Sequence, residues 1–319
     1  MTVSEYIVKY LKACGVTHYF GYQGTMIAYF VDAIHRESGI YNHVSYNEQG
    51  AALAASGYAK ATGEMAVAYA TSGPGAINLL QGIADAYYDS APVLFITGQL
   101  NLSEYTDHPQ LRQQGFQQTD IVNICKPITK NALMVTSPTD IPKVLDTLVA
   151  DMLHGRKGPV LLDIPMDIQR AQIDIPDDVI KNPLPDITQT KDDSDVSKIA
   201  SSIFESLKKA QRPVLFLGNG ISKNDVSRKN VQALIDKLQI PVVTTLLAKD
   251  LLPFDSEYNF GMLGYAYGHR YANLIINIKA DLIIAIGARL CPRQTGNRPA
   301  EFAKDAQIIR IDIDKEELN

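Results

Sequence analysis

The residue best suited to acid–base chemistry in this sequence is Glu48, which lies in the segment YNEQGAALAASGYAKATG. An extended run over residues 43–46 passes here into a predicted helix of small residues. A helix start favours an anion through its free N–H groups and its macrodipole. Glutamates at helix starts are common, however, and most only stabilise the first turn. On its own, Glu48 is therefore interpreted as a helix-start residue.

Two glycine turns are the next candidates, because glycine lets a backbone approach a ligand closely. Residues 71–75 read TSGPG between a predicted strand and a predicted helix, which suits a plain turn and a ligand loop about equally. This is neither a Walker sequence nor the dinucleotide fingerprint G-x-G-x-x-G. The turn Gly218-Asn219-Gly220 is weak evidence alone. It gains weight from glycines near other strands (Gly261, Gly264, Gly287), because open α/β sheets bind ligands at strand carboxyl ends.

Metal and nucleophile sites are not expected within this chain. The six histidines and three cysteines have no ligand spacing, and no G-x-S-x-G elbow occurs. Cys14, Cys125 and Cys291 are interpreted as buried thiols in a reducing compartment.

The elements that must position these residues are short apolar strands alternating with helices. Strands that are apolar almost throughout are typical of a parallel sheet covered on both faces. They are predicted over 65–70, 93–97, 160–164, 214–218, 242–245, 282–287 and 308–313. Helical spacing is found over 4–13, 49–61, 76–88, 139–153, 196–207 and 231–238. The alternation predicts an α/β fold of two doubly wound, open parallel-sheet domains.

A segment rich in proline and aspartate, residues 171–195, predicts a linker between domains 1–170 and 196–319. The sequence stops soon after the last predicted strand, which resembles a cut. The net charge of −5, without a basic cluster, argues against nucleic acid. No apolar run is long enough for a membrane span or signal peptide, so we expect a cytoplasmic protein.

Several ordered segments resemble the acetolactate synthase branch of the thiamine-diphosphate-dependent enzymes, over essentially the whole chain. They are the Glu48 segment, ATSGPGAINLLQGIADAYYDSAPVLFITGQ, GFQQTDIV, KPITK, GRKGPVLLDIPMDI, TTLLAKDLLPFD, NFGMLGYAYGHRYANLIINIKADLIIAIGARL and IIRIDIDKEEL. The resemblance implies a pyrimidine-binding domain followed by a Rossmann-like central domain. The family's pyrophosphate-binding domain, whose Gly-Asp-Gly motif holds Mg²⁺ and the diphosphate, has no match here. We therefore expect a fragment or one chain of a split enzyme, inactive and weak in cofactor binding by itself.

The resemblance also gives Glu48 a chemical role. In the family this glutamate hydrogen-bonds the aminopyrimidine ring, and the cofactor then decarboxylates a 2-keto acid and joins the product to a second one. For this chain the family implies pyruvate as substrate, a homodimer or tetramer, and a place in branched-chain amino acid biosynthesis.

Other site residues are implied one by one. Gly24 matches the loop that faces the thiazolium, Gln117 beside Phe116 matches the cofactor-side glutamine, and Lys130 matches a lysine near the substrate channel. The remaining matches on the thiamine diphosphate side are Thr71, Ser72, Gly73, Asn78 and Gln99.

Two departures from the family pattern leave the substrate open. Residues 22–25 read YQGT instead of Val-Pro-Gly-Gly, and NLSEYTDHPQLRQQG over 101–115 is longer than the usual loop. Decarboxylation or ligation of another 2-keto acid, and a non-catalytic binding or assembly role, remain alternatives.

FAD binding in the central domain is also left open. Matches to flavin-contacting positions are Ser90, Arg156, Gly218, Gly220, Thr245, Leu246, Leu263, Gly264, Gly287 and Arg289. Against them, the stretch Met262–Gly268 carries an extra residue and two tyrosines, and Leu290-Cys291 replaces Phe-Asp.

Overall fold

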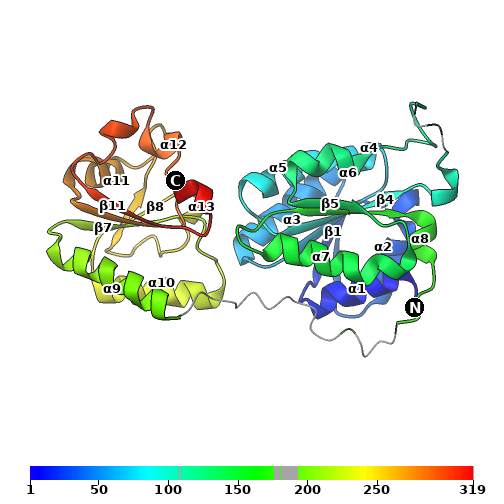
Figure 1. Cartoon of the computed structure of the whole chain (residues 1–319), viewed down its shortest axis with the longest axis horizontal. Helices are drawn as coiled ribbons and strands as arrows, with labels where there is room; N and C mark the ends of the chain where they lie inside the picture. The colour runs from blue at the N-terminus through cyan, green and yellow to red at the C-terminus, as the bar shows by residue number, and fades with distance from the viewer. Residues whose placement is uncertain (107, 109, 176–179, 181–192, 319) are drawn as a thin grey trace. The chain divides into compact units, whose positions relative to one another are not determined.

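The computed structural model describes residues 1–106, 108, 110–175, 180 and 193–318. The chain divides into two compact units, Met1–Ile187 and Thr188–Asn319 (Figure 1). The predicted linker lies largely outside the described residues, and each unit is treated by itself below.

The first unit is built on a six-stranded sheet in the order β2-β1-β3-β4-β6-β5, with every pair of neighbours parallel. The strands are β1 (His18–Gly21), β2 (Tyr41–Val44), β3 (Ala66–Ala70), β4 (Val93–Gln99), β5 (Asn131–Met134) and β6 (Val160–Pro165). All residues of β3, β4 and β6 are buried, whereas the edge strand β2 is mostly exposed. The predicted parallel sheet with central apolar strands is confirmed.

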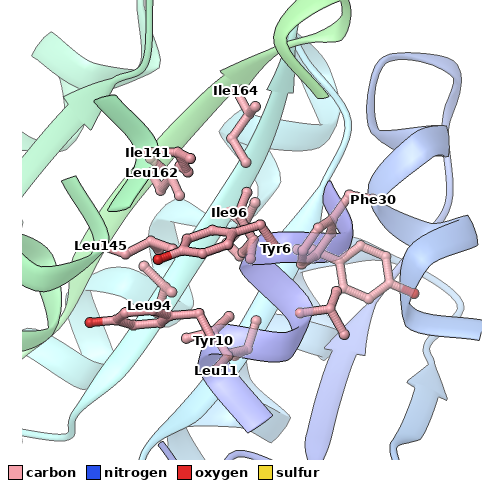
Figure 2. Close-up of a cluster of buried hydrophobic side chains, with 14 of the residues drawn as sticks. Tyr6, Tyr10, Leu11, Phe30, Leu94, Ile96, Ile141, Leu145, Leu162 and Ile164 are labelled. Atoms are coloured by element: carbon pink, nitrogen blue, oxygen red, sulfur yellow. The ribbon is translucent and has the colours of Figure 1, made fainter. Parts of the chain in front are cut away.

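Helices cover both faces of this sheet (Figure 1). One face packs against α1 (Val3–Ala13), α2 (Ala28–Arg36) and α7 (Ile141–Leu153). Figure 2 shows this layer, in which aromatic side chains of α1 and α2 lie beside aliphatic side chains of β4, β6 and α7. Its labelled members are Tyr6, Tyr10, Leu11, Phe30, Leu94, Ile96, Ile141, Leu145, Leu162 and Ile164.

The other face packs against α3 (Glu48–Thr62), α5 (Leu80–Tyr88) and α6 (Ile121–Cys125). The alanines of α3 lie in this layer, and a side chain at Gly82 of α5 would collide with Ala52. Small residues therefore let α3 and α5 approach closely. Two short helices, α4 (Pro74–Asn78) and α8 (Met166–Arg170), follow β3 and β6.

The second unit has a five-stranded sheet in the order β11-β10-β7-β8-β9, again with parallel neighbours throughout. Its strands are β7 (Pro213–Leu217), β8 (Val242–Thr244), β9 (Asn259–Met262), β10 (Leu282–Ile286) and β11 (Gln307–Ile311). Side chains of α9 (Asp193–Lys209) and α10 (Asp225–Leu238) join the core on one face. On the other face lie α11 (Arg270–Leu274) and the π-helical turn Ile275–Lys279. Short helices α12 (Pro292–Thr295) and α13 (Lys315–Leu318) complete the unit.

The structure adds elements that the sequence patterns did not predict. Strands β1, β5 and β9 have four residues each and carry no β-branched side chain. The helix predicted over 76–88 is in fact two helices, α4 and α5, which meet at Leu79. Short 3₁₀ turns lie at Thr25–Ile27, Leu102–Glu104, Lys126–Ile128, Pro138–Asp140, Leu246–Ala248 and Pro299–Glu301. Among the described helices, none has the length and apolar character needed to cross a membrane.

Candidate functional site

The first unit gathers most of the predicted site residues at the carboxyl edge of its sheet. The strand order reverses at β1, which lies between β2 and β3. In open α/β sheets, ligands bind beside the loops that follow the strands at such a point. Gly24 follows β1, Glu48 follows β2, Thr71 follows β3 and Gln117 lies in the long loop after β4.

Glu48 is the first residue of α3, and its side chain is held between two helices. Asn47 caps the helix by accepting a hydrogen bond from the Gly50 N–H at 2.7 Å. The Glu48 residue is only 8% exposed, and its Oε2 accepts a hydrogen bond from Asn78 Nδ2 at 3.0 Å. A Cβ atom at Gly75 would lie 3.1 Å from Glu48 Oε1, so glycine there leaves room for the carboxylate. The result is a nearly buried carboxylate with a fixed direction.

The loops after β1 and β3 lie directly on one another. A Cβ atom at Gly24 would lie 2.5 Å from the Thr71 Cβ, and the Met26 N–H donates to Thr71 Oγ1 at 3.2 Å. Ser72, the next residue, is buried. Glycine is thus required at position 24 for this contact.

The loop after β4 closes over the turn at Gly73. Both Gly73 and Gln117 have positive φ, of 61° and 56°, and a Cβ atom at Gly73 would collide with the Gln117 carbonyl oxygen. A cavity of about 420 Å³ lies between α4 and this loop. Its lining is Pro74, Ile77, Asn78, Gln113, Gln117 and Thr119. Phe116, beside Gln117, is 74% exposed.

Gln99 behaves differently from its neighbours in the predicted site. It ends β4, is 2% exposed, and its Nε2 donates at 3.0 Å both to the Thr119 carbonyl and to Asp163 Oδ2. The side chain therefore lies inside the protein and braces the loop after β4.

Asp163 was missed by sequence analysis. It lies within β6, is 1% exposed, and its Oδ1 accepts a hydrogen bond from Thr97 Oγ1 at 2.6 Å. Burial raises the pKa of this carboxyl to about 7, against the hydrogen bonds from Thr97 and Gln99, which lower it. The available signal was a lone acid in the apolar strand VLLDIP.

Three predicted site residues lie at the opposite, amino edge of the same sheet, namely Ser90, Lys130 and Arg156. Lys130 precedes β5 and donates to the His154 carbonyl at 2.6 Å, and burial lowers the pKa of its ammonium. Arg156 precedes β6 and donates from Nε to Ser90 Oγ at 2.9 Å. Within this unit, these three residues lie at the edge of the sheet opposite to Glu48.

Both units contain a stretch that matches a known protein family. Residues 1–124 match the thiamine pyrophosphate enzyme N-terminal TPP binding domain, and residues 200–319 match the central domain of the same enzymes. The chain belongs to the thiamine pyrophosphate enzymes. The resemblance seen in the sequence is confirmed, and the match to the TPP-binding N-terminal domain lies within the first unit.

Relatives of this thiamine pyrophosphate enzyme include acetolactate synthase large subunits. The chain is 38% identical over 311 residues to that of Pyropia yezoensis, covering 95% of this chain and 50% of the relative. It is 37% identical over 315 residues to that of Lactococcus lactis, covering 99% and 52%. A probable large subunit of Methanocaldococcus jannaschii is 37% identical over 326 residues, covering 100% and 52%. The chain thus spans about half the length of these relatives.

In the central domain of this thiamine pyrophosphate enzyme, the strand order reverses between β7 and β10. The glycine turns after these strands are in contact, because the Gly220 N–H donates to the Gly287 carbonyl at 2.9 Å. A side chain at Gly218 would also collide with that carbonyl oxygen. Thr245, after β8, has a buried hydroxyl without a hydrogen-bond partner among the described residues.

At two other predicted flavin-contacting residues of this domain, Gly264 and Arg289, a side chain of the protein itself lies in contact. A Cβ atom at Gly264 would lie 2.5 Å from the Tyr267 ring, and Arg289 pairs with Glu317 at 2.8 Å. Leu263 is buried, while Leu246 is 43% exposed. Across the described part of the chain, no three His, Cys, Asp or Glu side chains are grouped closely enough to hold a metal ion.

Proposed function

We propose that Glu48 shares a proton with the aminopyrimidine ring of thiamine diphosphate at the carboxyl edge of the first sheet. The observation that carries this proposal is a nearly buried carboxylate, oriented by Asn78, in a TPP-binding domain. A carboxylate held in this direction can share a proton with a ring nitrogen. The cofactor would supply the electron sink for decarboxylation.

The neighbouring residues support this assignment by their shape. The Gly24 and Gly73 turns present backbone rather than side chains near Thr71 and Gln117. Asn78 and Gln117 contribute amide groups to the cavity. These groups can orient a polar heterocycle without adding a competing charge.

For the whole protein, we propose an acetolactate synthase-like reaction: decarboxylation of pyruvate and ligation of the product to a second 2-keto acid. It would need Mg²⁺ and thiamine diphosphate. The support is the similarity to acetolactate synthase large subunits along the chain. The long loop after β4 supports a second candidate, the same chemistry on another 2-keto acid. Incubating the full-length protein with pyruvate, thiamine diphosphate and Mg²⁺ separates the two, because acetolactate should accumulate only if the first is right.

The proposed role of Glu48 predicts that Glu48→Gln abolishes turnover in the full-length protein while leaving the fold intact. Glutamine cannot share a proton with the ring but preserves the shape of the side chain. The control is Asp225→Asn, because Asp225 is also the first residue of a helix capped by asparagine but is exposed. Turnover is measured by substrate consumption and folding by circular dichroism. Full activity in Glu48→Gln would show that Glu48 does not activate the cofactor.

We propose further that the central domain binds FAD beside Thr245, whose unpartnered hydroxyl and neighbouring glycine turns suit a dinucleotide. Tyr267 must then move from Gly264. The purified protein should be yellow and absorb in the flavin band, and Tyr267→Ala should increase the bound flavin. A colourless protein that takes up no added FAD would contradict this proposal.

We propose a homodimer as the functional unit. Large apolar side chains are exposed on and before the helices that frame Glu48. They are Tyr46, Leu53, Ile77, Tyr87 and Tyr88. A second copy of the chain covering these helices would bury them and exclude water from the carboxylate.

A further inference from the structure

A chain of hydrogen bonds connects β6 to the wall of the cavity. Asp163 Oδ2 accepts from Gln99 Nε2, and the same nitrogen donates to the Thr119 carbonyl, both at 3.0 Å. The other end of the Gln99 amide, Oε1, accepts from the Leu100 N–H at 3.0 Å. Asp163 and Gln99 are 1% and 2% exposed, so the bond between their side chains is buried, whereas the bond to Thr119 is partly buried.

The chemistry of these partners fixes the orientation of the Gln99 amide. Two acceptors, the Asp163 carboxylate and the Thr119 carbonyl, face the nitrogen, and one donor, the Leu100 N–H, faces the oxygen. A rotated amide would place oxygen against two acceptors. Asp163 is therefore one of three groups that keep the Gln99 donor directed at Thr119.

Thr119 is the point at which this chain of bonds reaches the candidate site. Thr119 and Gln117 both line the cavity, and Gln117 has a positive φ and lies on Gly73. Immediately after Thr119, Asp120 caps α6 by accepting from the Asn123 N–H at 3.1 Å. The segment between Gly73 and α6 is thus held from inside at Thr119.

We infer that Asp163 is a positioning residue, which acts through Gln99 to fix the Gln117–Thr119 wall of the cavity. Asp163 is buried in β6, and its hydrogen bond to Gln99 is its link to this wall. The inference rests on the proposed function of the same site, because a fixed wall matters for catalysis only if the cavity takes the cofactor or substrate. The hydrogen bonds themselves do not depend on that proposal.

The test is hydrogen exchange of the full-length protein, read over residues 115–121, in three variants. Asp163→Leu removes the acceptor, so exchange of this segment should be about tenfold faster, the change expected for one lost buried hydrogen bond. Asp163→Asn should restore slow exchange, because its carbonyl can accept from Gln99 while its amide faces the Thr97 hydroxyl. Thr97→Val is the control, because it removes the other bond to Asp163 without reaching the loop.

A purely structural role predicts a different pattern. Thr97→Val would then loosen residues 115–121 as much as Asp163→Leu does, and that result would overturn the inference. So would unchanged exchange in a folded Asp163→Leu variant. If Asp163→Leu does not fold, Gln99→Met breaks the same chain of bonds at its middle and should give the same fast exchange.

Turnover of the same proteins separates this inference from the proposed function. A wild-type protein without thiamine-dependent turnover would contradict the function but not the positioning, which exchange reports alone. With turnover present, Asp163→Leu should lower kcat about tenfold, and Asp163→Asn should recover it.

Discussion

At Asp163, the free energy of unfolding depends on the charge of one buried carboxyl. Its pKa is raised to about 7 in the folded protein and is about 4 in an unfolded chain. The folded state thus binds the proton more tightly. Proton binding by Asp163 contributes about 4 kcal/mol at most to the free energy of unfolding. This contribution is fully present below pH 4 and is lost as the pH rises from 4 to 7.

This dependence predicts a difference between wild type and Asp163→Asn, which has no proton to lose. The free energy of unfolding of the wild type, minus that of the variant, should fall between pH 4 and 7 and stay level above. The other titratable groups that face Asp163 are Asp120, which raises its pKa further, and Tyr105 and Cys125. Both of the latter have pKa values raised to about 12, outside this range. Urea unfolding at each pH measures the difference, and a constant value would contradict the burial of a titrating carboxyl.

Individual residues could be predicted from sequence only where the surrounding pattern was specific. Glu48 was found as a helix-start acid, and the family resemblance supplied its role. Its bond to Asn78 and the space left by Gly75 depend on α3 meeting α4, which no local pattern encodes. Asp163 was overlooked because a single acid does not change the apolar pattern of its strand.

At the scale of elements, the contact between the β3–α4 turn and the loop after β4 depends on Gly73. Gly73→Ala would introduce a side chain at positive φ and against the Gln117 carbonyl. We expect weaker thiamine diphosphate binding and a free energy of unfolding lowered by more than about 2 kcal/mol.

The matched control is Gly155→Ala, because Gly155 has φ of 59° but no atom within 4 Å of an added Cβ. It should lose only the backbone contribution, about 1 kcal/mol, with cofactor binding unchanged. Calorimetric titration measures cofactor binding, and thermal unfolding measures the loss of stability. Equal losses in the two variants would show that the Gln117 contact is unimportant.

The elements themselves were predictable in proportion to their length and burial. Continuous apolar strands such as β4 and β6 and amphipathic helices such as α7 have clear patterns. Strand β5 has only four residues, NALM, and takes its conformation from pairing with β6. Strand order depends on pairings between strands that are far apart in the sequence, and that information is spread over the whole unit.

At the scale of the whole molecule, the proposed homodimer predicts that Leu53→Glu gives a monomer. Leu53 is exposed on α3, and a dimer covering this helix would bury the new carboxylate without a partner. The control is Val226→Glu on α10 of the central domain, which is 68% exposed. Sedimentation velocity distinguishes the two. A dimeric Leu53→Glu protein would place the interface elsewhere.

The parallel arrangement of both sheets has a consequence for how the chain acquires its structure. Every paired strand in the two described sheets runs parallel to its neighbour, so no pair can form as a local hairpin. On one side, strand β4 pairs with β6, which is synthesised only after α6, β5 and α7. Loop closure precedes the gain from pairing, so folding is slow and apolar strands stay exposed meanwhile. Slow synthesis at low temperature, or chaperones, should therefore raise the yield of native protein.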